Sequence, residues 1–171
     1  MVSLSDEDAF VEYYRDRRDV VRRNAYMLCG DWHRADDLAQ TALVALHRKW
    51  NSIKNPQAVD AYVRTTLVRA MIDESRRPWR RERTEAQPPE PPPSPGSSQD
   101  GAERVATRVT LIEALRVLPP RQRAVLVLRY LDGLDVAETA RVLGCRQGTV
   151  KSQTSHGLAA LRMVLGDDGD G

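Results

Sequence analysis

The chain has 171 residues, which suffices for one ordinary domain or two small ones. Its 26 basic and 24 acidic residues leave a formal net charge of +2, which excludes a uniformly basic surface for polyanions. The two cysteines lie far apart and outside metal-ligand spacings, which argues against a zinc site or a disulfide framework. No segment approaches the ~20 apolar residues of a membrane helix, and the acidic start does not resemble a signal peptide. We therefore expect a cytoplasmic protein without a membrane partner.

The first half of the chain shows helical periodicity in three successive stretches. Apolar residues recur there at steps of three, four and seven, and the stretches are separated by a Gly-Asp pair and by the sequence NSIKNPQ. Pro78 ends the third stretch, because its ring is not accommodated in a helix interior. The three stretches cover residues 10–28, 38–50 and 59–71. We expect a domain of three or four helices over residues 6–83.

A proline-rich segment follows at residues 85–101, with the sequence EAQPPEPPPSPGSSQDG. It lacks nearly every large apolar side chain, so it could not bury enough surface to offset the entropy lost on ordering. Its prolines favour an extended path. We expect a flexible linker over residues 84–107, with the role of a spacer as the simplest interpretation.

The second half of the chain is also periodic in the helical manner, and no segment alternates with period two. A short apolar face at 109–118 stops at a proline pair, and the next helix is expected at 121–131. The segment VAETARVLG forms a third helix beginning near Asp135, and RQGTVKSQTSHGLAALRMVL continues as the last. We therefore predict an all-α fold for both halves, with a second domain at 108–165 and a disordered tail at 166–171.

Ala140, Gly144 and Val150 have the spacing of a helix-turn-helix. The alanine lets two helices approach, the glycine makes a left-handed turn, and the valine packs the second helix on the first. A plain helical hairpin is the alternative, but the side chains after the turn favour DNA binding, since they can contact bases and phosphates. The predicted DNA-binding residues are Arg146, Gln147, Thr149, Lys151, Ser152, Gln153, Ser155 and His156. The apolar side expected to dock this helix comprises Leu158, Leu161 and Val164.

The segment 64–83 is rich in arginine and ends in the run RRPWRRER. One interpretation is a solvated charged face. The other is contact with DNA, in which guanidinium groups follow phosphates and Tyr62 or Trp79 offers a plane for a base to stack on. The sequence alone leaves both interpretations open.

Two other classes of protein match parts of the pattern. A transcriptional regulator could carry the same helix-turn-helix, but its sensor domain should show strands or a pocket, whereas the first half here is helical and arginine-rich. An enzyme could use Cys29 as a nucleophile, and the imaginable acid–base groups or metal ligands are Asp31, His33, Asp36 and Asp37. The adjacent aspartates point to different sides of a helix, and His33 has no partner at an i+4 metal spacing. We predict no catalytic residue, no metal and no cofactor, and interpret the acidic helix start as a cap.

Two segments resemble the extracytoplasmic-function, or group 4, sigma factors of the sigma-70 family: GDWHRADDLAQTALVALHRKW and LPPRQRAVLVLRYLDGLDVAETARVLGCRQGTVKSQTSHGLAALR. The sequence KSQTS is similar to that of a SigE-like subgroup common in actinobacteria. The resemblance covers nearly all of residues 10–165 and implies sigma region 2 in the first domain and region 4 in the second. The implied partners are RNA polymerase core and promoter DNA. An anti-sigma factor is a further conceivable partner, which nothing in the chain identifies.

The resemblance also assigns a surface to each task. The helix containing DDLAQ would dock on the clamp coiled coil of the largest polymerase subunit, through Asp36, Asp37, Gln40, Leu43, Val44 and His47. The following loop and helix would capture the minus-10 element as it melts, which costs a few kcal/mol that the protein must return. The residues implied there are Asn51, Lys54, Asn55, Tyr62, Arg64, Arg69, Asp73, Arg76 and Arg77.

Region 4 would place its predicted DNA-binding residues in the major groove of the minus-35 element and its outer surface against the polymerase flap. Gln153 and His156 stand where many relatives carry an arginine pair, so the exact minus-35 sequence stays open.

Overall fold

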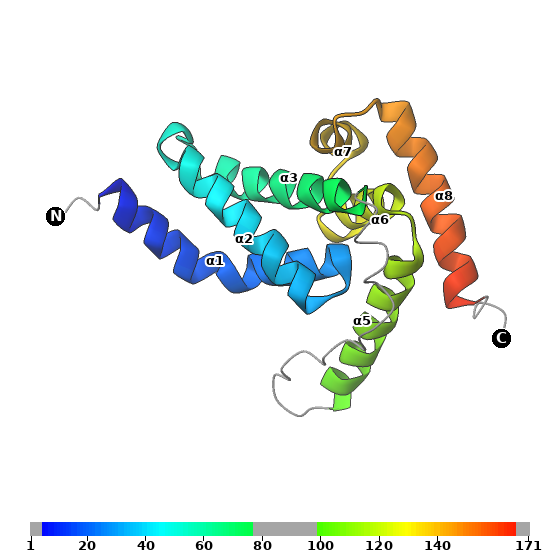
Figure 1. Cartoon of the computed structure of the whole chain (residues 1–171). Helices are drawn as coiled ribbons and strands as arrows, with labels where there is room; N and C mark the ends of the chain where they lie inside the picture. Colours follow the sequence, from blue (N-terminus) through cyan, green and yellow to red (C-terminus); the bar gives the residue numbers. More distant parts are fainter. Residues whose placement is uncertain (1–4, 77–98, 167–171) are drawn as a thin grey trace. The chain divides into compact units, whose positions relative to one another are not determined.

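The computed structural model describes residues 5–76 and 99–166, except for the side chains of residues 99–101 and 105–109. Every regular element in these ranges is a helix, which confirms the all-α prediction. The chain divides into two compact units, Met1–Arg76 and Arg77–Gly171 (Figure 1). Among the described residues, no helix is long and apolar enough to cross a membrane.

The described part of the first unit, residues 5–76, forms three α-helices and a short 3₁₀ turn. These elements are α1 (Asp6–Cys29), α2 (Trp32–Lys49), η1 (Trp50–Ser52) and α3 (Pro56–Ser75). α1 and α2 pack along one another, and α3 contacts both (Figure 1). The helices begin earlier than the predicted stretches, because each stretch was counted from an apolar residue that lies inside the helix.

Capping side chains set the start of each helix in the first unit. Ser5, Asp31 and Asn55 each accept a hydrogen bond from a backbone N–H group in the following turn, at 2.8–3.2 Å. These bonds satisfy donors that have no partner within the helix. Gly30 ends α1 in the left-handed conformation, with a φ of 69°. The cap predicted at the acidic start of the second helix is therefore confirmed for Asp31.

The core of the first unit lies where its three helices meet. Its largest fully buried side chains are Leu38, Leu46, Leu67, Met71 and Val68. Burying one such side chain contributes roughly 1.5–3 kcal/mol. The fully buried Ala25 and Ala42 keep α1 and α2 close together. The polar sides of the helices are thereby left as the outer surfaces of the unit.

In the second unit, residues 99–166 form four α-helices and a π-helical turn. These elements are α5 (Gln99–Val117), α6 (Pro120–Leu126), η3 (Val127–Leu131), α7 (Val136–Leu143) and α8 (Gln147–Leu165). α6 and α7 pack against α8, and α5 also contacts it (Figure 1). The helix predicted over 121–131 is therefore present, with its last turn widened.

α5 begins inside the range 84–107 that the composition assigns to a linker. The proline run ends at Pro95, and the sequence from Gln99 onward contains the strong helix formers Ala102, Glu103 and Arg104. The absence of large apolar side chains therefore did not prevent a helix there. The predicted linker residues 84–98 and tail residues 167–171 lie outside the described part of the chain.

A buried arginine ties α6 to the end of α5. Arg123 is only 7% exposed, and its guanidinium donates hydrogen bonds to the backbone carbonyls of Leu115, Arg116 and Leu118 at 2.8, 3.1 and 3.0 Å. The last carbonyls of a helix have no partner within it, so this side chain acts as a C-terminal cap from a neighbouring element. The periodicity of the sequence contains no signal for this role.

Candidate functional site

The helix-turn-helix predicted from Ala140, Gly144 and Val150 is present in α7 and α8. Gly144 ends α7 with a φ of 63°, a left-handed backbone conformation that favours glycine. The space around its Cα is open, so the conformation and not crowding calls for glycine here. Ala140 and Val150 are buried in one cluster with Val125 of α6. The motif is thus packed on the rest of its unit through the residues that define its spacing.

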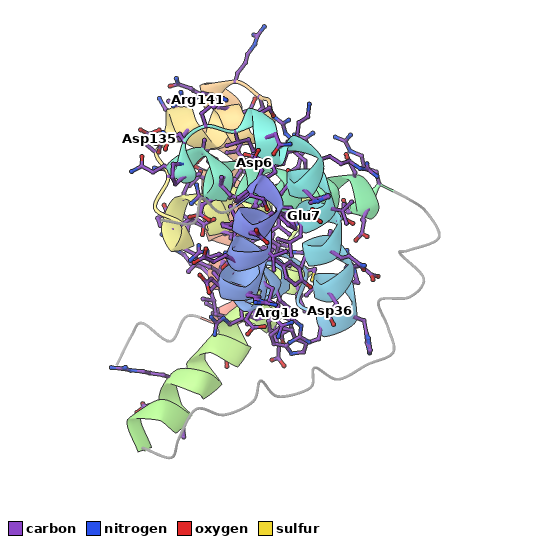
Figure 2. The ribbon with its side chains drawn as sticks, turned by 90° about the vertical axis from the view of Figure 1, so that its left-hand side faces the viewer. Asp6, Glu7, Arg18, Asp36, Asp135 and Arg141 are labelled. Carbon is purple, nitrogen blue, oxygen red and sulfur yellow. The ribbon has the colours of Figure 1, made fainter. Side chains whose placement is uncertain are left out.

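α7 starts at a capping box. The Asp135 carboxylate accepts from the Glu138 N–H at 2.7 Å, and the Glu138 carboxylate accepts from the Asp135 N–H at 2.9 Å. Figure 2 shows Asp135 together with Arg141, which lies in the last turn of the same helix. The short helix in front of the turn is therefore held at both of its ends.

The start of α8 presents one continuous polar surface, which we call the α8 tip. Seven of the eight predicted DNA-binding residues are exposed, whereas Gln153 is half-buried. The opposite side of the helix is buried through Val150, Thr154 and Gly157. Successive residues turn by about 100°, which places Gln153 at the edge between the two sides. The α8 tip comprises Arg146, Gln147, Thr149, Lys151, Ser152, Ser155 and His156.

Gly157 is a packing residue that the sequence pattern did not single out. A Cβ atom at this position would lie 3.2 Å from the side chain of Leu126 in α6. The absence of a side chain therefore allows α8 to approach α6 closely. The signal in the sequence was the step from Val150 and Thr154 to Gly157, which repeats the spacing of a buried helical side.

The far end of α8 differs from the prediction. Leu158 and Leu161 are half-buried as expected, but Val164 is 44% exposed. Val164 keeps the same side as Gly157, seven residues earlier, but α6 has only seven residues and cannot cover the nineteen of α8. The expectation that Val164 docks the helix was therefore wrong.

A groove of about 590 Å³ lies between α1 and α2. Five of the six residues that the resemblance assigns to polymerase binding line it, since steps of three and four along α2 place them on one side. These residues are Asp36, Gln40, Leu43, Val44 and His47. Asp37 is exposed and does not line the groove, because one residue along a helix turns by about 100°.

The other wall of the groove comes from α1, which the sequence pattern did not assign to any site. Its lining residues are Phe10, Tyr14, Arg18, Asp19 and Arg22. Figure 2 shows Arg18 of α1 and Asp36 of α2 at the same end of the first unit. Only the packing of α1 along α2 brings these segments together, so spacing within either helix could not have revealed this wall.

A layered cluster fixes the aspartate end of the groove. Arg22 forms an ion pair with Asp36, and its guanidinium also lies 4.3 Å from the ring centroid of Trp32. Tyr26 stacks on the ring of Trp32, with the ring centroids 3.9 Å apart and the ring planes at 3° to one another. Both charged side chains are about half exposed, so the ion pair contributes little to stability but orients the carboxylate.

The residues implied for the minus-10 element divide into two groups. Asn51, Lys54 and Asn55 are exposed in the connection between α2 and α3, although the Asn55 carboxamide oxygen is engaged in capping α3. Along α3, steps of seven, four and three bring Tyr62, Arg69, Asp73 and Arg76 to one side, with Tyr62 half-buried and the others exposed.

Two of the residues implied for the minus-10 element stand apart from this side. Arg64 is half-buried and lies on the other side of α3 from Tyr62. Arg77, like the rest of the run RRPWRRER, lies outside the described residues. The common side of α3 is therefore built without these two arginines.

α1 contacts the connection between α2 and α3 through an aromatic and polar cluster. The Tyr13 hydroxyl donates a hydrogen bond to Asp60 Oδ1 at 2.9 Å, and Arg17 lies 3.4 Å from the same oxygen. Burial, reinforced by the hydrogen bond and charge of Asp60, raises the pKa of Tyr13 to about 12. With this raised pKa, the hydroxyl is protonated at neutral pH and can donate to Asp60. The ring centroid of Tyr13 also lies 5.6 Å from that of Trp50.

The residues considered for an enzyme have structural roles or lie apart. Cys29 is buried with its Sγ 3.2 Å from the carbonyl oxygen of Asp31, and Asp31 caps α2. Within residues 5–76 and 99–166, no three His, Cys, Asp or Glu side chains are grouped as a metal site requires.

Comparison with known proteins identifies the two units. Residues 13–81 match the family Sigma-70 region 2, and residues 108–161 match the family Sigma-70, region 4. The chain is 41% identical over 156 residues to an RNA polymerase sigma-E factor of Streptomyces avermitilis, covering 91% of this chain and 84% of that protein. The chain belongs to the extracytoplasmic-function sigma factors of the sigma-70 family. The resemblance noted in the sequence is therefore confirmed, and the protein is a promoter-recognising sigma factor of RNA polymerase.

Other relatives of this sigma factor agree. It is 41% identical over 157 residues to an RNA polymerase sigma-E factor of Streptomyces coelicolor, covering 91% of this chain and 85% of that protein. It is 32% identical over 161 residues to the ECF RNA polymerase sigma factor SigM of Mycobacterium tuberculosis, covering 94% and 79%. In fold it resembles the sigma factor RpoE co-crystallised with the anti-sigma factor NepR from Bartonella quintana. That likeness has a TM-score of 0.67 at 22% identity, covers 94% of this chain and 98% of the other, and concerns the fold alone.

Proposed function

We propose that this sigma factor binds core RNA polymerase through the α1–α2 groove, captures the minus-10 element with the α2–α3 connection and α3, and recognises the minus-35 element with the α8 tip. Residues 6–83 would form the first functional domain and residues 108–165 the second, joined by residues 84–107, of which the part from Gln99 onward is helical. The observation that carries the proposal is the gathering of five implied polymerase-binding residues in one groove. Such a protein would work in the cytoplasm, where RNA polymerase transcribes.

The α1–α2 groove has the composition of a protein interface. Val44 is 44% exposed and stands beside the aromatic Phe10, while Arg18, Asp19 and Asp36 supply charge around them. An apolar centre within a polar rim suits a partner helix that carries both apolar and charged side chains. The clamp coiled coil of the largest polymerase subunit has that form.

The exposed side of α3 offers two kinds of contact with a melted strand. Arg69 and Arg76 can pair with phosphates, and the half-buried ring of Tyr62 can stack on a base. Asn51 and Lys54 stand at the exposed connection that precedes the helix, where an unstacked base could be bound. Stacking and hydrogen bonds of this kind offset the cost of about a few kcal/mol for taking a base out of the duplex.

The α8 tip fits the major groove because its exposed donors occupy the first three turns of one helix. Arg146, Gln147 and Lys151 can contact base edges, whereas Thr149 and Ser152 can bind phosphates. The two DNA-binding surfaces are small and the net charge is near zero, so free DNA binding should be weak and salt-sensitive. Polymerase would therefore contribute most of the affinity for a promoter.

The proposal is tested by run-off transcription from fragmented genomic DNA, with purified core polymerase and with or without the protein. We expect new start sites that share minus-35 and minus-10 motifs at a constant spacing. A variant of the α8 tip should lose the minus-35 motif from its start sites while it still binds core polymerase. Start sites that keep the same minus-35 motif in that variant would contradict the assignment of the α8 tip.

A further inference from the structure

The connection between α2 and α3 has few bonds of its own. The Ile53 N–H donates to the carbonyl of Trp50 at 3.3 Å, and the Ser52 hydroxyl donates to the carbonyl of Lys49 at 2.8 Å. Residues 51, 52 and 54–57 are exposed, so no core packing holds their backbone. Their conformation must depend largely on how the two flanking segments are anchored.

The first flank is anchored by rings from α1. Trp50, which opens η1, lies 5.4 Å from Phe10 at an angle of 81° and 5.6 Å from Tyr13, measured between ring centroids. Phe10 also contacts the ring of His47, one turn earlier in α2, at 4.7 Å. Edge-to-face pairs of this kind restrict the orientation of both rings.

The second flank is anchored by polar groups from the same part of α1. Asp60 stands in the second turn of α3 and accepts the hydrogen bond of Tyr13, with Arg17 beside it. Tyr13 therefore contacts both flanks: its ring meets Trp50 before the connection, and its hydroxyl meets Asp60 after it. A single side chain thus bridges the two ends of the connection.

We propose that Tyr13, Trp50 and Asp60 are positioning residues for minus-10 recognition, because together they hold residues 51–57 in the conformation that receives DNA. The inference rests on the proposed assignment of this connection to the minus-10 element. None of the three needs to touch DNA. Their effect is on the shape of a segment whose own side chains make the contacts.

A purely stabilising role would give a different result from a positioning role. Tyr13→Phe keeps the ring on Trp50 and removes the hydroxyl that bonds Asp60 and lies beside Arg17, and Asp60→Asn removes the charge that faces both this hydroxyl and Arg17. Loss of stability alone would reduce all activities in proportion to the folded fraction. A displaced connection would reduce discrimination at the minus-10 element and leave the minus-35 element and core binding unchanged.

The experiment uses the full chain with core polymerase and measures open-complex formation on promoters with matched or substituted minus-10 and minus-35 elements. We expect Tyr13→Phe and Asp60→Asn each to lower minus-10 discrimination about three- to tenfold, and the double variant to lose no more than either single one. Discrimination at minus-35 and core affinity should stay at the wild-type values. Tyr130→Phe, the same chemical change at an exposed site of the second unit, is the matched control.

The double variant Asn51→Ala with Lys54→Ala separates this inference from the assignment beneath it. If it loses minus-10 discrimination while Tyr13→Phe and Asp60→Asn keep it, the positioning role is overturned and the DNA-binding assignment survives. If the Asn51 and Lys54 variant keeps full discrimination, the connection does not bind the minus-10 element and both fall. Equal losses at both promoter elements in Tyr13→Phe would also overturn the positioning role.

Discussion

The two units of this sigma factor build their binding surfaces in different ways. The α8 tip takes all its residues from the N-cap and first ten positions of one helix, whereas the α1–α2 groove and the α2–α3 connection depend on side chains from separate helices. The second unit is therefore expected to lose one function when one exposed residue changes. In the first unit, residues far from the partner should also matter, because they hold those that touch it. The following variants test that difference.

The largest expected effect is on the second unit as a whole, through Arg123. Replacing it with methionine would remove three hydrogen bonds to carbonyls at the end of α5, at a cost of about 3 kcal/mol. The carbonyls of Arg116 and Leu118 would lose this donor, whereas that of Leu115 would still accept from the Leu118 N–H. We expect urea unfolding followed by circular dichroism to show an early transition for the second unit and an unshifted one for the first. Arg104→Met, at an exposed position of α5, should leave both transitions unchanged. A single unshifted transition for Arg123→Met would show that other contacts hold α5 and α6 together.

A smaller and more specific effect is expected from the α8 tip. Arg146→Ala or Lys151→Ala removes a side chain able to contact a base edge, so each should weaken minus-35 recognition about tenfold without changing core affinity. The measurement is transcription from matched and mutated minus-35 sites. Arg162→Ala, exposed at the far end of the same helix, is the control. If either tip variant discriminates between the two sites as well as the wild type does, that residue does not recognise bases.

The groove gives a comparison between adjacent residues. Asp36 lines it and is oriented by Arg22, whereas Asp37 lies outside it. Reversing both charges should weaken core association, and we expect Asp36→Lys to account for most of the loss, about tenfold against less than about threefold for Asp37→Lys. Titration of labelled core polymerase measures each affinity. Equal losses would mean that the polymerase contacts a wider face of α2 than the groove, and full affinity in the double reversal would remove the assignment.

The same contrast explains what the sequence could predict. Local signals sufficed for the helices, the cap at Asp31, the helix start near Asp135 and the glycine turn of the helix-turn-helix, since each depends on residues a few positions apart. The pairs Arg22–Asp36 and Tyr13–Asp60 join different helices and have no signature in spacing. Arg123 was hidden for the same reason. Val164 followed the periodicity of its helix, but the length of the neighbouring helix decided its exposure.

The smallest expected effect is a change of stability at high pH, and it tests the contact on which the positioning role depends. The pKa of Tyr13 is about 12 in the folded unit against 10.0 for the free side chain, because burial and Asp60 both disfavour the phenolate. A raised folded pKa gives a contribution to stability that is complete below pH 10 and is lost as the pH rises through about 12. Tyr13→Phe lacks that contribution, so the stability advantage of the wild type over this variant should shrink across the interval.

Since Tyr13 is only partly buried, the change should be modest. Comparing the urea midpoints of the two proteins at each pH cancels the titration of all other groups. A constant difference would show that the pKa of Tyr13 is not raised in the folded unit, so that its hydroxyl is neither buried nor bonded to Asp60 in solution. The link between the two ends of the α2–α3 connection would then rest on the rings of Phe10, Tyr13 and Trp50 alone.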